Sequence, residues 1–206
     1  MNSKLFIVLL LGIGALAPMA ASAEGCFQQA QPWMVRVGGH NIDPTGGTSN
    51  TSAGGVAVDS KFGLTLNLDY RLCKNLSVDV LGSQLFTHDL KLNGTKVGTT
   101  QLLPPTLTLQ YHILPDTRFD PFVGVGVNYT HFWHERINVP GVSLHLSPTF
   151  GFAAQAGVDI ALAPRWVMGV DVRYMQIEPD AYVNGTKIGT VNVDPVAYGV
   201  NFGYRF

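Results

Sequence analysis

Apolar and polar residues alternate along most of this chain, and the clearest run lies at residues 62–72. Every second position of this run is apolar, at Phe62, Leu64, Leu66, Leu68, Tyr70 and Leu72. Successive side chains of a β-strand point to opposite faces, so the run predicts a strand with one apolar face and one polar face. So many matches in succession favour a strand over a chance pattern.

The same alternation predicts seven further strands, at about residues 33–41, 76–85, 103–113, 123–130, 150–160, 166–174 and 196–206. Short connections at residues 73–75, 114–120 and 163–165 alternate with four longer ones. Gly, Ser, Thr and Asn dominate residues 44–58 without an apolar period, which predicts an exposed loop there. The second long connection contains Asn93-Gly94, a hairpin signal. The third and fourth span about residues 131–147 and 179–192.

The final strand places aromatic residues on one face, and its last three, Phe202, Tyr204 and Phe206, resemble the signal by which the assembly machinery recognises outer-membrane barrels. An even number of strands with apolar residues outward is typical of such barrels. The pattern therefore predicts an all-β fold, an eight-stranded antiparallel transmembrane β-barrel of the up-and-down type. Long loops are expected outside the cell, and short turns and both termini in the periplasm.

The first residues have the features of a secretory signal peptide. Lys4 precedes an apolar stretch at residues 5–17, and Ala21-Ser22-Ala23 offers small residues for cleavage. We therefore expect residues 1–23 to be removed and residues 24–206 to form the barrel. A helix that spans a membrane needs a run of about 18 apolar residues, and the sequence has no such run after this segment.

Composition excludes some partners and suggests one cross-link. The 206 residues carry a formal charge of −1 and no basic run, which argues against a nucleic-acid partner. An exported chain meets an oxidising compartment, so Cys26 and Cys73 are predicted to form a disulfide. Two unpaired thiols remain the alternative, because sequence does not show whether the two Cα atoms approach.

The inward positions divide the barrel interior into two parts. Charged residues occupy the half nearest the short turns, at Arg36, Asp69, Arg71, Asp79, Asp159, Asp171, Arg173 and Arg205. Buried charges need partners, so we expect a network that closes the periplasmic half. Further from the turns, Leu81, Leu85, Met175 and Ile177 predict an apolar lining. A hydrophobic solute entering there would leave sideways between strands, whereas a filled, inert barrel is the alternative.

No catalytic pattern is present. His131, His134 and Glu135 have a spacing that would suit a metal on one helical turn, but no further ligand has a known position, so a solvated loop is favoured. His40, His88 and His112 are predicted to make hydrogen bonds in the lumen or at its rim. No nucleophile lies near a base by motif, so neither an enzyme nor a bound cofactor is expected.

Several motifs are similar to those of the outer membrane protein W family. They are Leu103-Pro-Pro-Thr-Leu-Thr-Leu109, Pro121-Phe-Val-Gly-Val-Gly-Val-Asn-Tyr-Thr130, Gln155-Ala-Gly-Val-Asp159, Tyr174-Met175, Asp194-Pro195 and Gly203-Tyr-Arg-Phe206. The resemblance covers nearly all of the expected mature chain. It implies an eight-stranded barrel in the outer membrane of a Gram-negative bacterium, among lipids and lipopolysaccharide. It also implies porin-like passage of small hydrophobic molecules or, alternatively, a surface receptor for toxins or phages without transport.

Overall fold

The computed structural model describes residues 26, 30–46, 49–51, 54–58, 60–83, 86–92, 95–103, 105–137 and 143–206. It gives no side-chain environment for residues 49–51, 54–58, 83, 86–92, 95–103 and 133–137. The predicted signal peptide and Leu85 lie outside the described residues. In the part of the chain that is described, no helix is long and apolar enough to cross a membrane.

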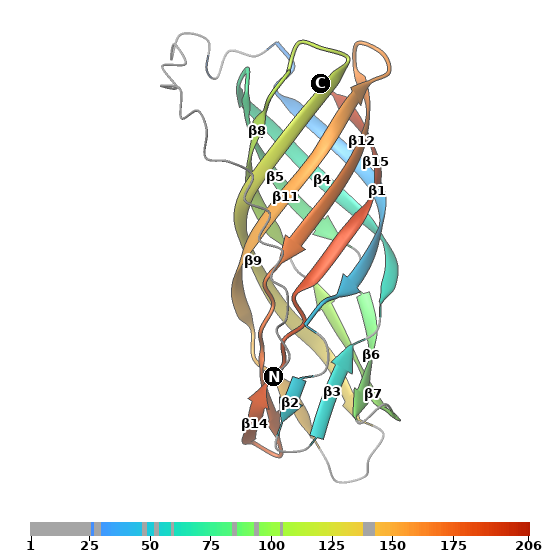
Figure 1. The fold of residues 1–206 in the computed structure, drawn as a ribbon, viewed down its shortest axis with the longest axis vertical. Helices are drawn as coiled ribbons and strands as arrows, with labels where there is room; N and C mark the ends of the chain where they lie inside the picture. The colour runs from blue at the N-terminus through green and yellow to red at the C-terminus, as the bar shows by residue number, and fades with distance from the viewer. Residues whose placement is uncertain are drawn as a thin grey trace, which may run out of the picture.

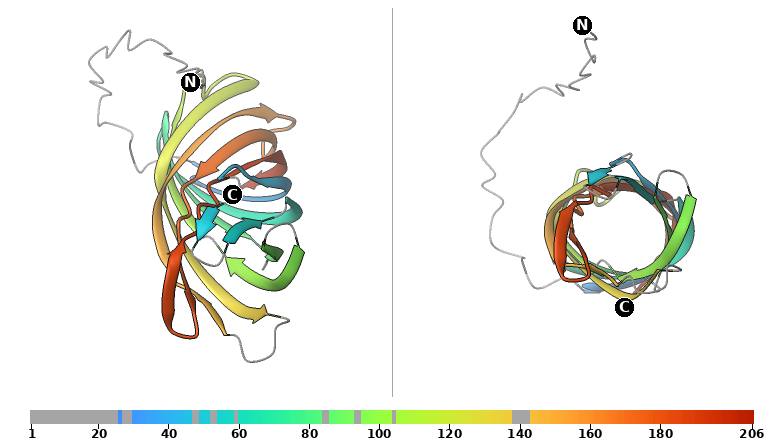
Figure 2. Two further views of the ribbon diagram at one scale, coloured as in Figure 1. Left: turned by 60° about the horizontal axis from the view of Figure 1, so that its bottom comes forward. Right: turned by 90° about the horizontal axis from the view of Figure 1, so that it is seen from below.

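Eight antiparallel strands close into a barrel, as the sequence predicted (Figures 1 and 2). In order around the barrel they are β11 (Thr149–Ala161), β12 (Trp166–Met175), β15 (Pro195–Arg205), β1 (Trp33–Pro44), β4 (Lys61–Cys73), β5 (Leu76–Ser83), β8 (Thr106–His112) and β9 (Phe119–Ile137). A further pairing between β9 and β11 completes the ring, which Figure 2 shows end-on. Each of these eight strands therefore has a paired strand on both sides.

The barrel strands carry apolar residues on the outside and polar residues on the inside. In β4, Phe62 is 69% exposed, whereas Asn67 and Asp69 on the other face are buried. The same inversion recurs in β11, where Phe150 is 78% exposed and Asp159 is buried. A soluble protein would place these faces the other way round, and this arrangement suits a barrel surrounded by lipid.

Close approach of β8 and β9 depends on a glycine that faces inward. Gly126 pairs with Thr108, and a Cβ added to it would lie 2.0 Å from the Leu107 carbonyl oxygen. At Gly82 in β5, an added Cβ would meet only the Leu66 oxygen at 3.7 Å. A side chain at Gly126 would therefore collide with β8, whereas one at Gly82 would fit against β4.

The two ends of the barrel differ. The end that carries the turns at residues 74–75, 113–118 and 162–165 is called the short-turn end, and it also holds the C-terminus (Figure 1). There Phe206 N donates to Trp33 O at 2.9 Å, so the first and last strands finish together. The opposite end is called the long-loop end.

Seven additional strands extend the long-loop end. They are β2 (Ser49–Thr51), β3 (Gly54–Val58), β6 (Phe86–Leu92), β7 (Thr95–Leu103), β10 (Leu144–Leu146), β13 (Asp180–Val183) and β14 (Thr186–Thr190). The predicted loop at residues 44–58 was therefore wrong in part, since β2 pairs with β3 and β3 with β6. The predicted loop at 131–147 was also wrong over residues 131–137, which continue β9 and pair with β7. These pairings are held by backbone hydrogen bonds, so they need no apolar period.

Candidate functional site

The buried guanidinium of Arg36 joins three strands across the half of the lumen nearer the short-turn end. Arg36 is 2% exposed and donates from Nε to Asp69 Oδ2 at 2.9 Å. Its other two nitrogens bind both oxygens of Asp159, at 2.5 and 2.7 Å. A planar guanidinium suits such a two-point contact, which fixes orientation as well as charge. Strands β1, β4 and β11 are thereby tied together through the interior.

The guanidinium of Arg173 connects two further buried acids, Asp79 and Asp171. Arg173 on β12 donates to Asp171 Oδ2 at 2.6 Å and to Asp79 Oδ2, on β5, at 3.1 Å. Asn67 supplies a further donor to Asp79 at 2.7 Å. Asn201 on β15 donates to Asp171 at 2.8 Å and accepts from Arg36 at 3.3 Å, so it links the two arginine clusters.

Two buried histidines complete the polar interior. His40 Nε2 lies 3.1 Å from Asp171 Oδ1, and its Nδ1 lies 2.8 Å from Thr65 Oγ1. His112 is held in the same way, with Nδ1 2.7 Å from Asp120 Oδ2 and Nε2 3.0 Å from Ser77 Oγ. Each ring therefore has a hydrogen-bonding partner on both nitrogens.

An apolar cluster lies between this polar interior and the loops, at the long-loop end. Its buried members are Ile42, Phe132, Leu146, Ala153, Met175, Ile177, Ala181, Val191, Val193 and Ala197. At this end the ladders of β12 with β15 and of β1 with β15 continue beyond the strands, because Val193 N donates to Ile177 O at 3.0 Å and Gly46 N donates to Val193 O at 3.1 Å. Thr106 Oγ1 lies 3.6 Å from Met175 Sδ, so the cluster reaches the wall at the start of β8.

Comparison with known proteins identifies the family. Residues 29–206 match the model of the OmpW family. The chain belongs to the OmpW family. Outer membrane protein W of Vibrio cholerae is 33% identical over 208 residues, which cover 92% of this chain and 93% of that protein.

Two further comparisons place this OmpW-family chain among its relatives. The crystal structure of OprG from Pseudomonas aeruginosa has a TM-score of 0.78 and 29% identity, covering 89% of this chain and 98% of that one. A relative named dibenzothiophene metabolism operon protein PahQ, also from Pseudomonas aeruginosa, is 24% identical over 205 residues, covering 92% of this chain and 95% of that protein. The fold is therefore that of a Gram-negative outer-membrane barrel.

The structure brings together six of the eight charged residues expected in this OmpW-family lumen, namely Arg36, Asp69, Asp79, Asp159, Asp171 and Arg173. Arg71 lies apart, 3.9 Å from Asp120, and Arg205 lines a pocket nearer the short-turn end. Sequence reasoning placed Asp120 in a connection and so missed its role. Asp120 is the last residue of the predicted connection at residues 114–120, three positions before the predicted strand.

The predicted apolar lining is only partly described. Met175 and Ile177 are buried within the apolar cluster, and Leu81 is buried on β5 near Thr106, with which it pairs. Met175 and Ile177 pack against other side chains instead of facing an open chamber. The sequence did not indicate that Val191 and Val193, at the end of the predicted fourth loop, would be buried in this cluster.

The possible metal ligands considered from the sequence differ from the one group that the described side chains bring together. His131 and His134 both lie on strand β9, so the helical turn considered from the sequence is not formed there. His112, Asp120 and Asp159 bring ligand atoms within 4.8 Å of one another. However, Asp120 contacts His112, and Asp159 is bound at both oxygens by Arg36. The donor set is thus occupied by protein partners.

The two cysteines are joined at the short-turn end. Cys26 and Cys73 form a disulfide in the structure. The segment that follows Cys26 reaches β4, where Arg71 N donates to Pro32 O at 2.7 Å. Residues 30–32 are thereby held beside the opening of the lumen.

Proposed function

We propose that this OmpW-family barrel allows passive passage of small hydrophobic molecules across the outer membrane. The observation that carries the proposal is the division of the lumen. An apolar cluster lies at the long-loop end, and an ion-paired network lies between it and the short-turn end. In this proposal the long loops face the outside of the cell and the short turns face the periplasm. A solute would thereby bypass the lipopolysaccharide layer, which resists hydrophobic molecules.

The charged network blocks a straight path. Arg36 and Arg173 between them hold four buried carboxylates. A hydrophobic molecule cannot replace any of these hydrogen bonds, and separating a buried pair leaves uncompensated charge at a cost of several kcal/mol. The solute would therefore need another exit from the apolar region.

A lateral exit is proposed near Leu81 and Thr106. The described ladder between β5 and β8 runs as far as this pair, and the next residue on the β8 side is Pro105, which has no N–H to donate. Leu81 is buried on the inner face, and Thr106 contacts Met175 of the apolar cluster. An apolar solute would pass from the cluster to this part of the wall and then into the bilayer.

The name of one relative supports hydrophobic cargo. PahQ is named for an operon of dibenzothiophene metabolism, and it matches 92% of this chain. Dibenzothiophene is an apolar aromatic compound of the size that this proposal concerns. The proposed partners are accordingly small hydrophobic solutes, with outer-membrane lipids around the barrel and the assembly machinery during insertion.

A second candidate function is a structural or receptor barrel without transport. It is favoured by the packing of Met175 and Ile177 against neighbouring buried side chains, Val191 and Val193 among them. In that case the lumen is a filled core, and binding would occur on the loops. The two candidates differ in whether the barrel raises permeability.

Uptake of a small hydrophobic fluorescent probe by cells tests the proposal. Wild-type protein should raise uptake several-fold over cells lacking it, whereas the double substitution Leu81→Arg/Met175→Arg should abolish the increase by placing charge on the path. The control carries two arginines at exposed positions, Ala30→Arg/Thr186→Arg, and should behave as wild type. Heat-dependent gel migration verifies that each barrel is folded. No increase with folded wild-type protein would favour the receptor reading.

A reversible staple tests the lateral exit itself. Gly82→Cys and Pro105→Cys place thiols on the residues that follow the Leu81–Thr106 pair, and the space at Gly82 accepts a side chain. The oxidised variant should lose uptake, and a reductant should restore it. Wild-type cells given the same reductant control for the native disulfide. Unchanged uptake in the stapled barrel would rule out this exit.

A further inference from the structure

Two exposed arginines flank the turn between β11 and β12 at the short-turn end. Arg118 lies directly before β9, and its carbonyl oxygen accepts from Ala161 N, at the end of β11, at 2.9 Å. Arg165 lies directly before β12, and its carbonyl oxygen accepts from Arg205 N at 2.8 Å. Since β9, β11 and β12 are neighbours in the barrel, two strand spacings of about 4.8 Å each separate the two backbones. Both long side chains can therefore reach the same small anionic group.

Neither guanidinium is paired with an acid among the described residues. The guanidinium carbon of Arg118 lies 6.0 Å from the centre of the Phe119 ring, and Arg165 Nη1 donates to the neutral Tyr204 hydroxyl at 3.2 Å. A guanidinium has five N–H donors, so both groups keep donors for a further partner. An anion beside this turn would accept from both of them.

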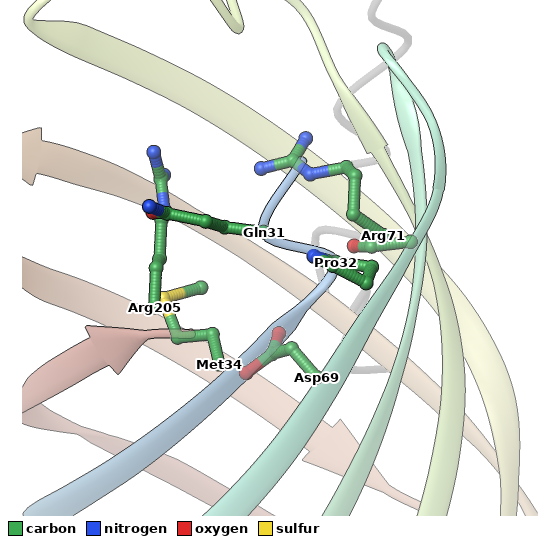
Figure 3. Close-up of a pocket in the computed structure, with 7 residues that line it drawn as sticks. Gln31, Pro32, Met34, Asp69, Arg71 and Arg205 are labelled. Carbon is green, nitrogen blue, oxygen red and sulfur yellow. The ribbon is translucent and has the colours of Figure 1, made fainter. Parts of the chain in front are cut away.

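The other cations at this end are placed differently. Lys74 is exposed but is paired with Asp116 on the next turn. Arg71 and Arg205 line a pocket in the mouth of the lumen, where Figure 3 shows both side chains. Arg71 also donates to the Lys74 carbonyl oxygen at 3.2 Å. Among the described residues, the exposed positive charge without an acid partner at this end is therefore that of the two arginines beside the β11–β12 turn.

Apolar side chains lie beside the two arginines on the outer face of the barrel. Phe119, Leu162 and Trp166 are all exposed there, and the Trp166 ring packs edge-on against Tyr204, with 5.0 Å between the ring centres. Aromatic residues in this position mark the boundary between bilayer and water in outer-membrane barrels. Positive charge at the water boundary thus lies beside side chains that contact acyl chains. A phospholipid has the matching order, with a phosphate group beside its acyl chains.

We propose that this surface binds a phospholipid with a net negative head group, such as phosphatidylglycerol, in the leaflet at the short-turn end. The phosphate oxygens accept from Arg118 and Arg165, and the acyl chains lie against Phe119, Leu162 and Trp166. A soluble anion would gain the charged contacts but not the apolar ones. A zwitterionic phospholipid carries its own cation, so two arginines attract it less. The site is independent of the proposed hydrophobic passage.

Quenching of Trp166 fluorescence tests the proposal, because this residue lies in the surface. Trp33→Phe/Trp133→Phe leaves Trp166 as the one tryptophan of the chain. This variant is placed in phosphatidylcholine vesicles with increasing amounts of phosphatidylglycerol brominated on its acyl chains, which quenches the fluorescence on contact. Brominated phosphatidylcholine is the comparison lipid. Phosphatidylglycerol should bind about fivefold more tightly for each arginine, the usual gain for a basic residue near an anionic lipid. Equal quenching by the two lipids would overturn the proposal.

Substitutions in the same background locate the site. Arg118→Gln/Arg165→Gln should abolish the preference for phosphatidylglycerol. The control Lys74→Gln/Lys187→Gln removes the same number of positive charges, from exposed lysines that are paired with acids, and should keep the preference. Heat-dependent gel migration verifies that each barrel is folded. A preference that survives in the arginine variant, or one that both variants lose, would overturn the proposal, because the lipid would then be attracted elsewhere or by net charge alone.

Discussion

Arg36 shows how much of the interior depends on one side chain. It is the shared partner of Asp69 and Asp159, both buried. Replacing it by methionine keeps much of the volume but leaves two carboxylates without their cation. We expect Arg36→Met to lower the free energy of unfolding by about 3–5 kcal/mol, measured by urea titration of the barrel in detergent.

The matched control is Arg165→Met. Arg165 is exposed at the short-turn end, where its Nη1 donates to Tyr204 Oη at 3.2 Å. Its loss should change stability by no more than about 0.5 kcal/mol. Equal stability of Arg36→Met and wild type would show that water or protons already neutralise the two acids.

For single residues the sequence was informative where the alternation of inward and outward positions along a strand decides which side chains face the lumen. Arg36, Asp69 and Asp159 all occupy inward positions of clean alternating runs, so their meeting was predictable. Which acid binds which arginine was not, because it depends on the stagger of neighbouring strands. Arg36 lies opposite Asn67, not Asp69, in the register with β4 and still binds Asp69, one diagonal step away.

At the scale of strands, Gly126 on β9 occupies a position where β8 leaves no room for a side chain. We expect Gly126→Ala to destabilise the barrel by about 1–3 kcal/mol, because its Cβ would collide with the Leu107 carbonyl of β8. Gly82→Ala, where the nearest atom lies at 3.7 Å, should cost less than about 1 kcal/mol. Urea titration of both variants decides the matter, and similar losses would show that β8 and β9 can move apart.

Alternation predicted all eight barrel strands but not the extent of the long-loop end. Residues 131–137 carry no simple apolar alternation, yet they continue β9 because β7 offers them backbone partners. The residues at 49–51 and 54–58 form β2 and β3 for the same reason. Where neighbouring backbones supply the hydrogen bonds, side-chain period loses its predictive value.

For the whole molecule, orientation in the membrane is the property to test. We expect Thr186→Cys, in the exposed hairpin of β13 and β14, to react with a membrane-impermeant maleimide on intact cells. Arg118→Cys, at the short-turn end, should react only after the outer membrane is permeabilised. Both positions are exposed on the protein, so the comparison reports sidedness. Labelling in the reverse order would invert the proposed orientation.

The link between Cys26 and Cys73 has a consequence for how such a chain is made. The two residues are 47 apart in sequence, and the covalent ring that they close contains β1, β2, β3 and β4. A ring of this size removes about 4 kcal/mol of chain entropy from the unfolded state in the loop-closure treatment. If oxidation comes first, the chain reaches the membrane with its first hairpin already in partial register. The pairing of β1 with β15, which closes the barrel, is then the last to form, and insertion starts from a chain whose first strands are already linked.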